Sequence, residues 1–288
     1  MDGISSDSLR EHIRRVVEKQ LEQTDTVAPE LGDLIRRYLS RPAKLIRPRL
    51  LTEAARVYGG EDTTAVLDLA AGTELLHVFA LIHDDRIDGI DRDNRPIKST
   101  GHEAALRVLA GDLLHTIADG VIAEAVARHH LSPRILETVR RISAVSVAGQ
   151  VRNMHFIEQA DTPPSRTRLF ELYDLKTGYY SFAAPLQIGA LAAAPEGTES
   201  EALEHMGLLL GRAFQLRDDA VDILELSSAD FEAVPAWELN LLATFLYETA
   251  PESEASWSGT LPGAPGAAFN ADPRARRQLI EAVDFAEL

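Results

Sequence analysis

The sequence predicts an all-α protein, built as a single-domain bundle of helices. Long segments carry apolar residues at helical spacing, and the central ones are apolar on most faces, as expected for a bundle rather than a solenoid. No segment shows clean alternation of apolar and polar residues or the turn chemistry of a β-hairpin. With 288 residues, 45% of them hydrophobic, the chain can bury a sizeable core.

The expected helices follow one another with short breaks. Pro42 and Pro48 bracket a turn before the third helix, and two glycines at 59–60 stop that helix. Residues 64–83 are almost continuously apolar or small, and their length favours a buried helix over a strand. The polar stretch 89–101 is expected to be a loop. The segments expected to be helical are 8–23, 31–39, 50–58, 64–83, 103–127, 135–157, 165–194, 199–226, 235–249 and 272–288.

The domain organisation follows from composition. Residues 1–250 are expected to form the helical domain. Residues 251–288 are expected to form a connection and a short last helix, because 251–266 is rich in Pro, Gly, Ser and Glu. No internal repeat of fixed period is present in the sequence.

The composition excludes several kinds of site. The absence of cysteine excludes disulfides, thiolate catalysis and cysteine-bound zinc. A formal charge of -16 argues against a surface for nucleic acid or anionic membranes. No amino-terminal stretch has the layout of a signal peptide, and the stretch nearest to a membrane span, 177–194, contains Pro185 and Gln187 and is better interpreted as a buried helix. We therefore expect a cytoplasmic protein without stable membrane insertion or a nucleic-acid partner.

Two acidic motifs, LIHDDRID and GRAFQLRDDAVD, each place three aspartates at one helix end. Residues four apart share a helix face, and clustered carboxylates repel one another unless a cation lies between them. Mg²⁺ prefers oxygen ligands, takes one or two carboxylates and keeps positions for water or phosphate, so two such ends facing each other would hold Mg²⁺ around a diphosphate. The alternative is a solvated acidic end, which the apolar run before each motif disfavours. The candidate ligands are Asp84, Asp85, Asp88, Asp218, Asp219 and Asp222.

Basic and amide side chains suited to a diphosphate lie around these motifs. A basic pair in the proline-bracketed turn is placed to clamp phosphate, and a lysine follows an apolar helix at YDLKTG. The candidates are Lys44, Arg47, His77, Arg92, Arg95, Gln150, Asn153 and Lys176. The alternative for the histidine is a packed position in the core. For the two arginines it is surface charge, and for the two amides a structural role.

These residues resemble the trans-type isoprenyl diphosphate synthases, the polyprenyl synthetase family, and geranylgeranyl and farnesyl diphosphate synthases in particular. The two acidic motifs in their contexts are highly specific together. KLIRP, ELLH, LAGDLL, GQ and KTG stand in family order before or between them. The resemblance runs from about Ala43 to Asp222 and implies the isoprenoid synthase bundle with a central substrate cavity.

The resemblance implies roles for these residues. The six aspartates would hold a cluster of about three Mg²⁺ ions on the diphosphate of an allylic substrate. Arg92 and Lys176 would bind that diphosphate. Lys44, Arg47 and His77 would bind the diphosphate of isopentenyl diphosphate. Thr177 and Gln215 would stabilise charge near the reacting carbons. Lys176 is also counted as catalytic, and Gln150 as a substrate contact.

The implied reaction is prenyl transfer with chain elongation. The allylic diphosphate would leave as a carbocation forms, the double bond of isopentenyl diphosphate would attack, and the departing diphosphate would take the released proton. Phe79 stands five residues before Asp84, and Ala80 follows it. A single aromatic residue at this place resembles enzymes whose products stop near twenty carbons, and a product of fifteen carbons stays an open alternative. A homodimer is also expected from the resemblance.

The chain departs from the family pattern at several positions. Pro42 and Ala43 replace the usual glycine pair, Asp93 replaces an arginine for which Arg95 is a possible substitute, and Asn153 replaces an aspartate. No lysine occurs after residue 176, and the chain is expected to stop before the family's last helices. These changes keep two alternatives open. One is an enzyme that ionises a prenyl diphosphate and cyclises it or alkylates another acceptor. The other is a non-catalytic partner subunit, which the retained aspartates disfavour.

Overall fold

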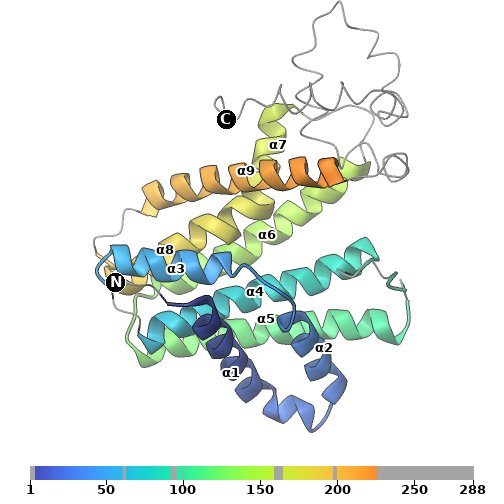
Figure 1. Cartoon of the computed structure of the whole chain (residues 1–288), viewed down its shortest axis with the longest axis horizontal. Helices are drawn as coiled ribbons and strands as arrows, with labels where there is room; N and C mark the ends of the chain where they lie inside the picture. Colours follow the sequence, from blue (N-terminus) through green and yellow to red (C-terminus); the bar gives the residue numbers. More distant parts are fainter. Residues whose placement is uncertain are drawn as a thin grey trace, which may run out of the picture. The chain divides into compact units, whose positions relative to one another are not determined.

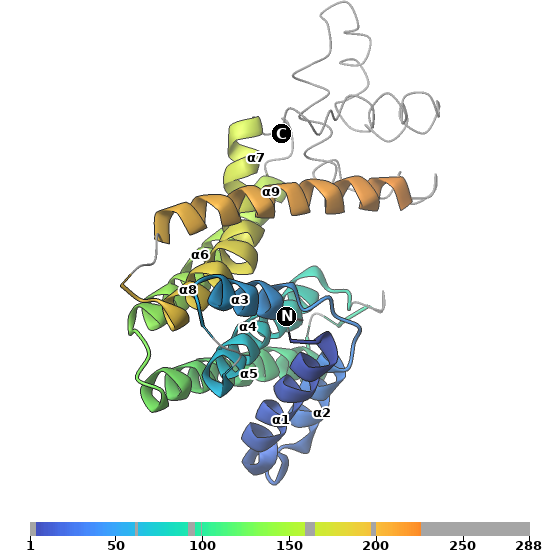
Figure 2. The same cartoon turned by 60° about the vertical axis from the view of Figure 1, so that its left-hand side comes forward.

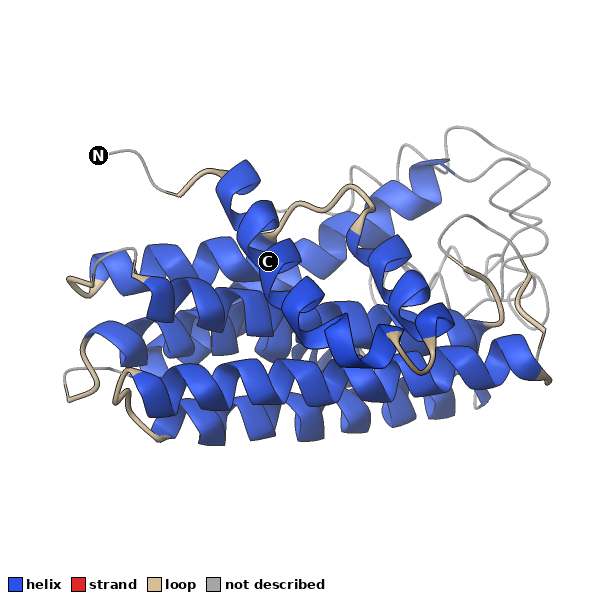
Figure 3. Cartoon of the chain, turned by 90° about the horizontal axis from the view of Figure 1, so that it is seen from below, coloured by secondary structure: helices blue, strands red, loops and turns tan. Residues whose placement is uncertain are grey.

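Helices make up nearly all of the protein that the computed structural model describes, namely residues 4–60, 63–91, 96–98, 100–158, 165–196 and 200–225. No strand occurs in this part of the chain, where a single isolated bridge joins Ile90 and Pro96 (Figure 3). The all-α prediction is therefore confirmed. In order, the helices are α1 (Ser6–Asp25), α2 (Pro29–Leu39), α3 (Ile46–Val57), α4 (Thr64–Asp88), α5 (His102–Arg128), α6 (Arg134–Glu158), α7 (Arg166–Tyr173), the π-helix η1 (Asp174–Ala183), α8 (Ala184–Ala193) and α9 (Ser200–Glu225).

Capping residues fix several helix ends. Ser5, Thr63 and Ser165 each precede a helix and accept a hydrogen bond from the backbone N–H three residues further on. Gly89 ends α4 in a left-handed conformation with φ of 73°, and its N–H donates to the carbonyl of Asp85. Helix α4 thus continues through the whole first acidic motif instead of ending at residue 83.

Contacts within the chain define two units, residues 1–142 with 181–205 and residues 143–180 with 206–288. The expected boundary between residues 250 and 251 and the helices expected at 235–249 and 272–288 lie outside the described residues.

The core of the first unit is built on α4. Helix α5 packs along it, α3 contacts both α4 and α8, and the α1–α2 hairpin covers α4 and α5 (Figures 1 and 2). Leu69, Leu75 and Ile82 of α4 are completely buried. A Cβ atom at Gly72 would lie 2.3 Å from the Ile122 side chain of α5, so glycine at this position allows the two longest helices of the core to approach closely.

Helix α4 is the one described helix that is long and apolar enough to cross a membrane. However, 67% of its most apolar stretch is buried inside the protein, which identifies it as a core helix. The expectation that 177–194 would be the segment nearest to a membrane span is therefore wrong.

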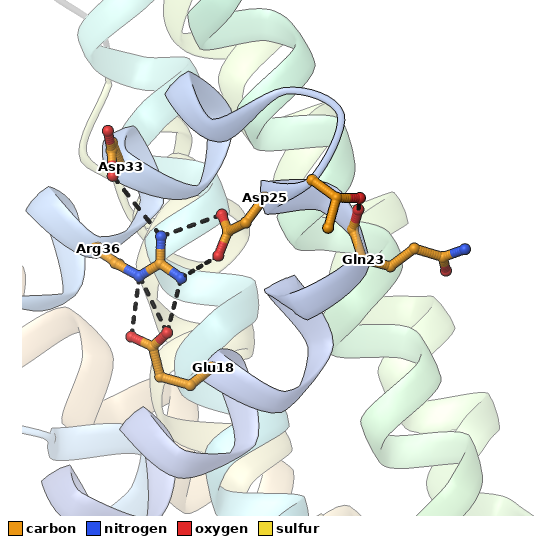
Figure 4. Close-up of polar contacts among 6 residues, drawn as sticks. Glu18, Gln23, Asp25, Asp33 and Arg36 are labelled. Carbon is orange, nitrogen blue, oxygen red and sulfur yellow. Dashed lines mark hydrogen bonds and ion pairs between the residues drawn. The ribbon is translucent and has the colours of Figure 1, made fainter.

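An ion-pair cluster around Arg36 closes the α1–α2 hairpin (Figure 4). The guanidinium of Arg36 on α2 donates to the carboxylates of Glu18 and Asp25 on α1, with Nη2 at 2.7 Å and 2.5 Å from their respective oxygens. Hydrogen bonds from Arg36 lower the pKa of both carboxyl groups. The cluster fixes α2, and with it Tyr38, next to α4.

Two helix boundaries differ from the predictions. The segment 165–194 is not one α-helix, because η1 separates α7 from α8. Pro185 gives a physical reason: it has no N–H to donate and its ring blocks a regular turn before it. Helix α3 begins at Ile46 rather than near residue 50, so that Arg47 and Pro48 lie in its first turn, where a missing N–H costs nothing.

Candidate functional site

The first acidic motif occupies the last turns of α4, and its three aspartates differ in exposure. Asp84 is half-buried and Asp88 is exposed, whereas Asp85 is only 3% exposed. Asp84 and Asp88 are four residues apart and share a helix face. The motif therefore divides into an outer pair of carboxylates and one inner carboxylate.

The inner carboxylate of Asp85 lies in a polar cluster from three other segments. The Tyr38 hydroxyl of α2 donates to Asp85 Oδ2 at 2.6 Å, and Arg41 Nη1 lies 3.8 Å from the same oxygen. Arg107 of α5 in turn donates to the Tyr38 oxygen at 3.2 Å. Burial, and then the hydrogen bond to Asp85, raise the pKa of Tyr38, so the hydroxyl stays protonated and acts as a donor.

The basic turn before α3 adopts an uncommon backbone conformation. Leu45 has φ of 51°, in the left-handed region that a leucine rarely enters, and its side chain is buried. Lys44 on one side of it is exposed, and Arg47 on the other is half-buried. Arg47 Nη2 donates to Ser181 Oγ of η1 at 2.6 Å. The two predicted phosphate-binding side chains thus flank a strained residue that turns its own side chain into the core.

Glu74 of α4 lies behind this turn and was not among the predicted site residues. It is 3% exposed, and burial raises its pKa while the nearby Arg47 partly offsets the shift. His77 lies three residues after Glu74 on α4 and is half-buried. A clue was present in the sequence, because Glu74 is a charged residue within an otherwise apolar run.

The ring of Phe79 is held by two histidines. It makes edge contacts with His83 on α4 and His115 on α5, with ring centroids 5.2 Å and 4.7 Å apart. His83 fits against α5 because residue 111 is glycine: a Cβ atom there would lie 2.1 Å from His83 Nε2. Phe79 is half-buried, so part of its ring remains accessible.

The second acidic motif belongs to the other unit, in α9. Its middle residue, Asp219, accepts hydrogen bonds from the Tyr173 hydroxyl of α7 and, at 2.7 Å, from Gln215 Nε2. Thr177 of η1 donates to Gln215 Oε1 at 2.9 Å. A continuous chain therefore joins Thr177, Gln215 and Asp219, three predicted site residues, while Asp218 is half-buried beside them.

Two features fix η1 in this unit. Arg212 of α9 makes two hydrogen bonds to the Asp174 carboxylate, at 2.8 Å and 2.6 Å. A Cβ atom at Gly149 of α6 would lie 2.9 Å from the backbone carbon of Leu175, so α6 meets the π-helix directly. Lys176, the next residue, is half-buried. Helix η1 is a π-helix, and π-helical turns are frequent at functional sites.

The remaining predicted residues fall into two groups. Gln150 and Asn153 are half-buried on α6. The predictions for Arg92, Asp93 and Arg95 lie outside the described residues. The backbone of Asp222 lies in α9, but its side chain is also outside the described part.

The outer aspartates have the chemistry for Mg²⁺. Within the described ranges no three acidic or histidine side chains come together in a geometry that could hold a metal ion. Mg²⁺ typically uses one or two protein carboxylates and completes its shell with water and substrate phosphate. Asp84, Asp88 and Asp218 are partly or fully accessible carboxylates that fit this use, whereas the half-buried Asp219 already accepts hydrogen bonds from Tyr173 and Gln215.

Comparisons with known proteins agree with these observations. Residues 28–230 match the family described as polyprenyl synthetase. The short chain isoprenyl diphosphate synthase of Methanothermobacter thermautotrophicus is 31% identical over 223 residues, covering 76% of this chain and 66% of that protein. The farnesyl diphosphate synthase of Geobacillus stearothermophilus is 33% identical over 198 residues, covering 64% of this chain and 63% of that protein. This chain thus spans just under two thirds of the length of both relatives.

A solved structure is similar over a longer stretch. The polyprenyl synthase from Caulobacter crescentus CB15, in complex with calcium and isoprenyl diphosphate, has a TM-score of 0.69 and 26% sequence identity to this chain. The match covers 96% of this chain and 82% of that one.

The close contact at Gly149 gives a testable prediction. In Gly149→Ala the added methyl group must displace η1, and we expect a stability loss of about 1–3 kcal/mol, measured by thermal or urea unfolding. Gly120→Ala on α5 is the matched control, since a Cβ atom there meets nothing within 4 Å. It should stabilise the protein by about 0.5–1 kcal/mol through helix propensity. Equal effects of both substitutions would contradict the close contact.

Proposed function

The chain belongs to the polyprenyl synthetase family, as its motifs predicted, and we propose that it is a Mg²⁺-dependent prenyltransferase. It condenses an allylic prenyl diphosphate with isopentenyl diphosphate to give a trans-prenyl diphosphate of about 15 to 20 carbons. The activity in the names of its relatives supports this proposal. So does the hydrogen-bonded chain from Thr177 through Gln215 to Asp219, which ties predicted catalytic groups to an acidic motif.

In this function the two basic regions bind two diphosphates. Lys176, and by resemblance Arg92, bind the allylic diphosphate. Lys44, Arg47 and His77 hold isopentenyl diphosphate, with Arg47 oriented by Ser181 and by the buried Glu74 behind it. Mg²⁺ supplies charge neutralisation to the leaving diphosphate when bound.

Bond breaking and bond making follow in order. The bond between the allylic carbon and the diphosphate oxygen breaks, with the electron pair leaving on oxygen. The positive charge that develops is stabilised by the oxygens of Thr177 and Gln215, whose orientations are fixed by their mutual hydrogen bond. The double bond of isopentenyl diphosphate forms the new carbon–carbon bond, and a proton passes from that unit to the departed diphosphate.

Two further parts of the proposal concern assembly and location. A homodimer is supported by an apolar stripe on α6, where Val147, Val151 and Met154 share a face and are 59%, 47% and 42% exposed. We propose a cytoplasmic location as well; the burial of α4 argues only that this helix is a core helix rather than a membrane span.

A second candidate function is ionisation of a prenyl diphosphate without isopentenyl diphosphate, followed by cyclisation or transfer to another acceptor. It is favoured by Asp93 and by the absence of lysine after residue 176, where the family resemblance leads us to expect basic residues. Lys44 and Arg47 favour elongation instead, since a cyclase has no second diphosphate to bind. A non-catalytic partner subunit is the third candidate, and it would have no use for the outer aspartates.

The metal assignment is tested by Asp84→Asn and Asp218→Asn. Each variant removes one negative charge from a proposed Mg²⁺ site, and we expect kcat to fall by at least about 100-fold. Asp7→Asn, at a side chain that is 94% exposed on α1, is the control and should leave the rate unchanged. If both motif variants kept the wild-type rate, the proposed function would be wrong for these residues.

Phe79→Ala tests the limit on product length. Loss of the ring that contacts His83 and His115 should leave space for a longer prenyl chain, so that the main product, identified by mass spectrometry, gains one or more isoprene units. The neighbouring Val78→Ala is the control: its side chain is buried in the core, and truncation should lower stability by about 1 kcal/mol without lengthening the product. An unchanged product from Phe79→Ala would exclude this role.

A further inference from the structure

We propose that Tyr38 and Tyr173 are positioning residues, each of which holds the middle carboxylate of one acidic motif through its hydroxyl group. The remaining aspartates of each motif are thereby presented to the diphosphate and its cations. This inference rests on the proposed function, and it assigns two residues outside both motifs to the organisation of the site.

In the first motif the anchor joins α2 to α4. The Tyr38 side chain is 5% exposed and the Asp85 side chain is similarly buried, so their 2.6 Å hydrogen bond is shielded from water. Arg107 donates to the Tyr38 oxygen, which fixes that hydroxyl as the donor toward Asp85. A buried carboxylate needs such partners, because an unpaired charge in the core is costly.

In the second motif the anchor joins α7 to α9. The Tyr173 hydroxyl donates to Asp219 Oδ2, and Gln215 donates to the other oxygen, Oδ1, at 2.7 Å. Tyr173 is 5% exposed and packs in a small core cluster with Leu169 and Leu216. Both oxygens of Asp219 therefore already accept a hydrogen bond from a side chain of the same unit.

The same arrangement occurs independently in the two units. In each motif the second aspartate is tied to a buried tyrosine that comes from a different helix. The first aspartates, Asp84 and Asp218, are half-buried; of the second aspartates, Asp85 is buried and Asp219 is half-buried. Asp85 and Asp219, predicted from the sequence as Mg²⁺ ligands, thus take the role of supporting residues, which orient neighbouring ligands rather than coordinate the ion.

The test measures metal binding directly. Binding of Mn²⁺ in the presence of inorganic diphosphate is followed by the electron paramagnetic resonance signal of free Mn²⁺, for the wild type and for Tyr38→Phe and Tyr173→Phe. We expect each variant to bind Mn²⁺ at least about tenfold more weakly, the usual effect of losing a partner of a metal ligand. Tyr58→Phe is the control, because its ring packs in the core near α8 and its hydroxyl makes no hydrogen bond among the described residues.

A double-variant cycle separates positioning from general stability. If Tyr38 acts through Asp85, then Tyr38→Phe added to Asp85→Asn should cause no further loss of Mn²⁺ affinity. Independent, multiplying losses would overturn the inference, as would unchanged Mn²⁺ binding in both tyrosine variants. Because the two tyrosines lie in different units, a variant that fails to fold leaves the other pair as the test. If the wild-type protein itself bound no Mn²⁺ in the presence of diphosphate, the proposed function would be wrong as well. If the wild type bound Mn²⁺ and the tyrosine variants bound it equally well, only the inference about the tyrosines would be wrong.

Discussion

The structure of the first unit depends on placing a carboxylate at the end of the buried helix α4. Helix α4 is the apolar centre of its unit, and its last turn brings the Asp85 carboxylate to a position that is 3% exposed. A charge at such a depth must be paired or hydrogen-bonded, since its desolvation would otherwise cost several kcal/mol. The Tyr38 hydroxyl, itself supported by Arg107, meets this need and links α2, α4 and α5 at the same place. The requirements of the core and those of the site are therefore satisfied by the same contacts.

The basic turn before α3 shows the same coupling. The left-handed Leu45 buries its side chain while Lys44 is exposed and Arg47 enters the first turn of α3. Glu74, buried near Arg47, is a second titratable group in the core of α4; burial raises its pKa, and the nearby Arg47 only partly offsets that shift. Both features involve the predicted phosphate-binding turn: the positive φ of Leu45 lies two residues before Arg47, and the buried Glu74 interacts with Arg47.

The sequence predicted the helices and the motifs well, because periodicity and residue type determine both. It placed Asp84, Asp85 and Asp88 together on α4, and Thr177, Gln215 and Asp219 in one region. It did not predict that Asp85 turns inward, since Tyr38 is 47 positions away in the chain and nothing in the local pattern identifies a distant partner. The π-helix was missed for a related reason: Pro185 indicates a break, but the close approach of Gly149 on α6 to η1 cannot be read from the local sequence.

The central claim is that the protein joins isopentenyl diphosphate to an allylic diphosphate. It is tested most directly by incubating the purified protein and Mg²⁺ with dimethylallyl, geranyl, farnesyl or geranylgeranyl diphosphate, each with and without isopentenyl diphosphate. Products are identified by mass spectrometry before and after phosphatase treatment. The account predicts a longer prenyl diphosphate that forms only when isopentenyl diphosphate is present. A hydrocarbon or alcohol formed without isopentenyl diphosphate, and no elongated product with it, would contradict the account.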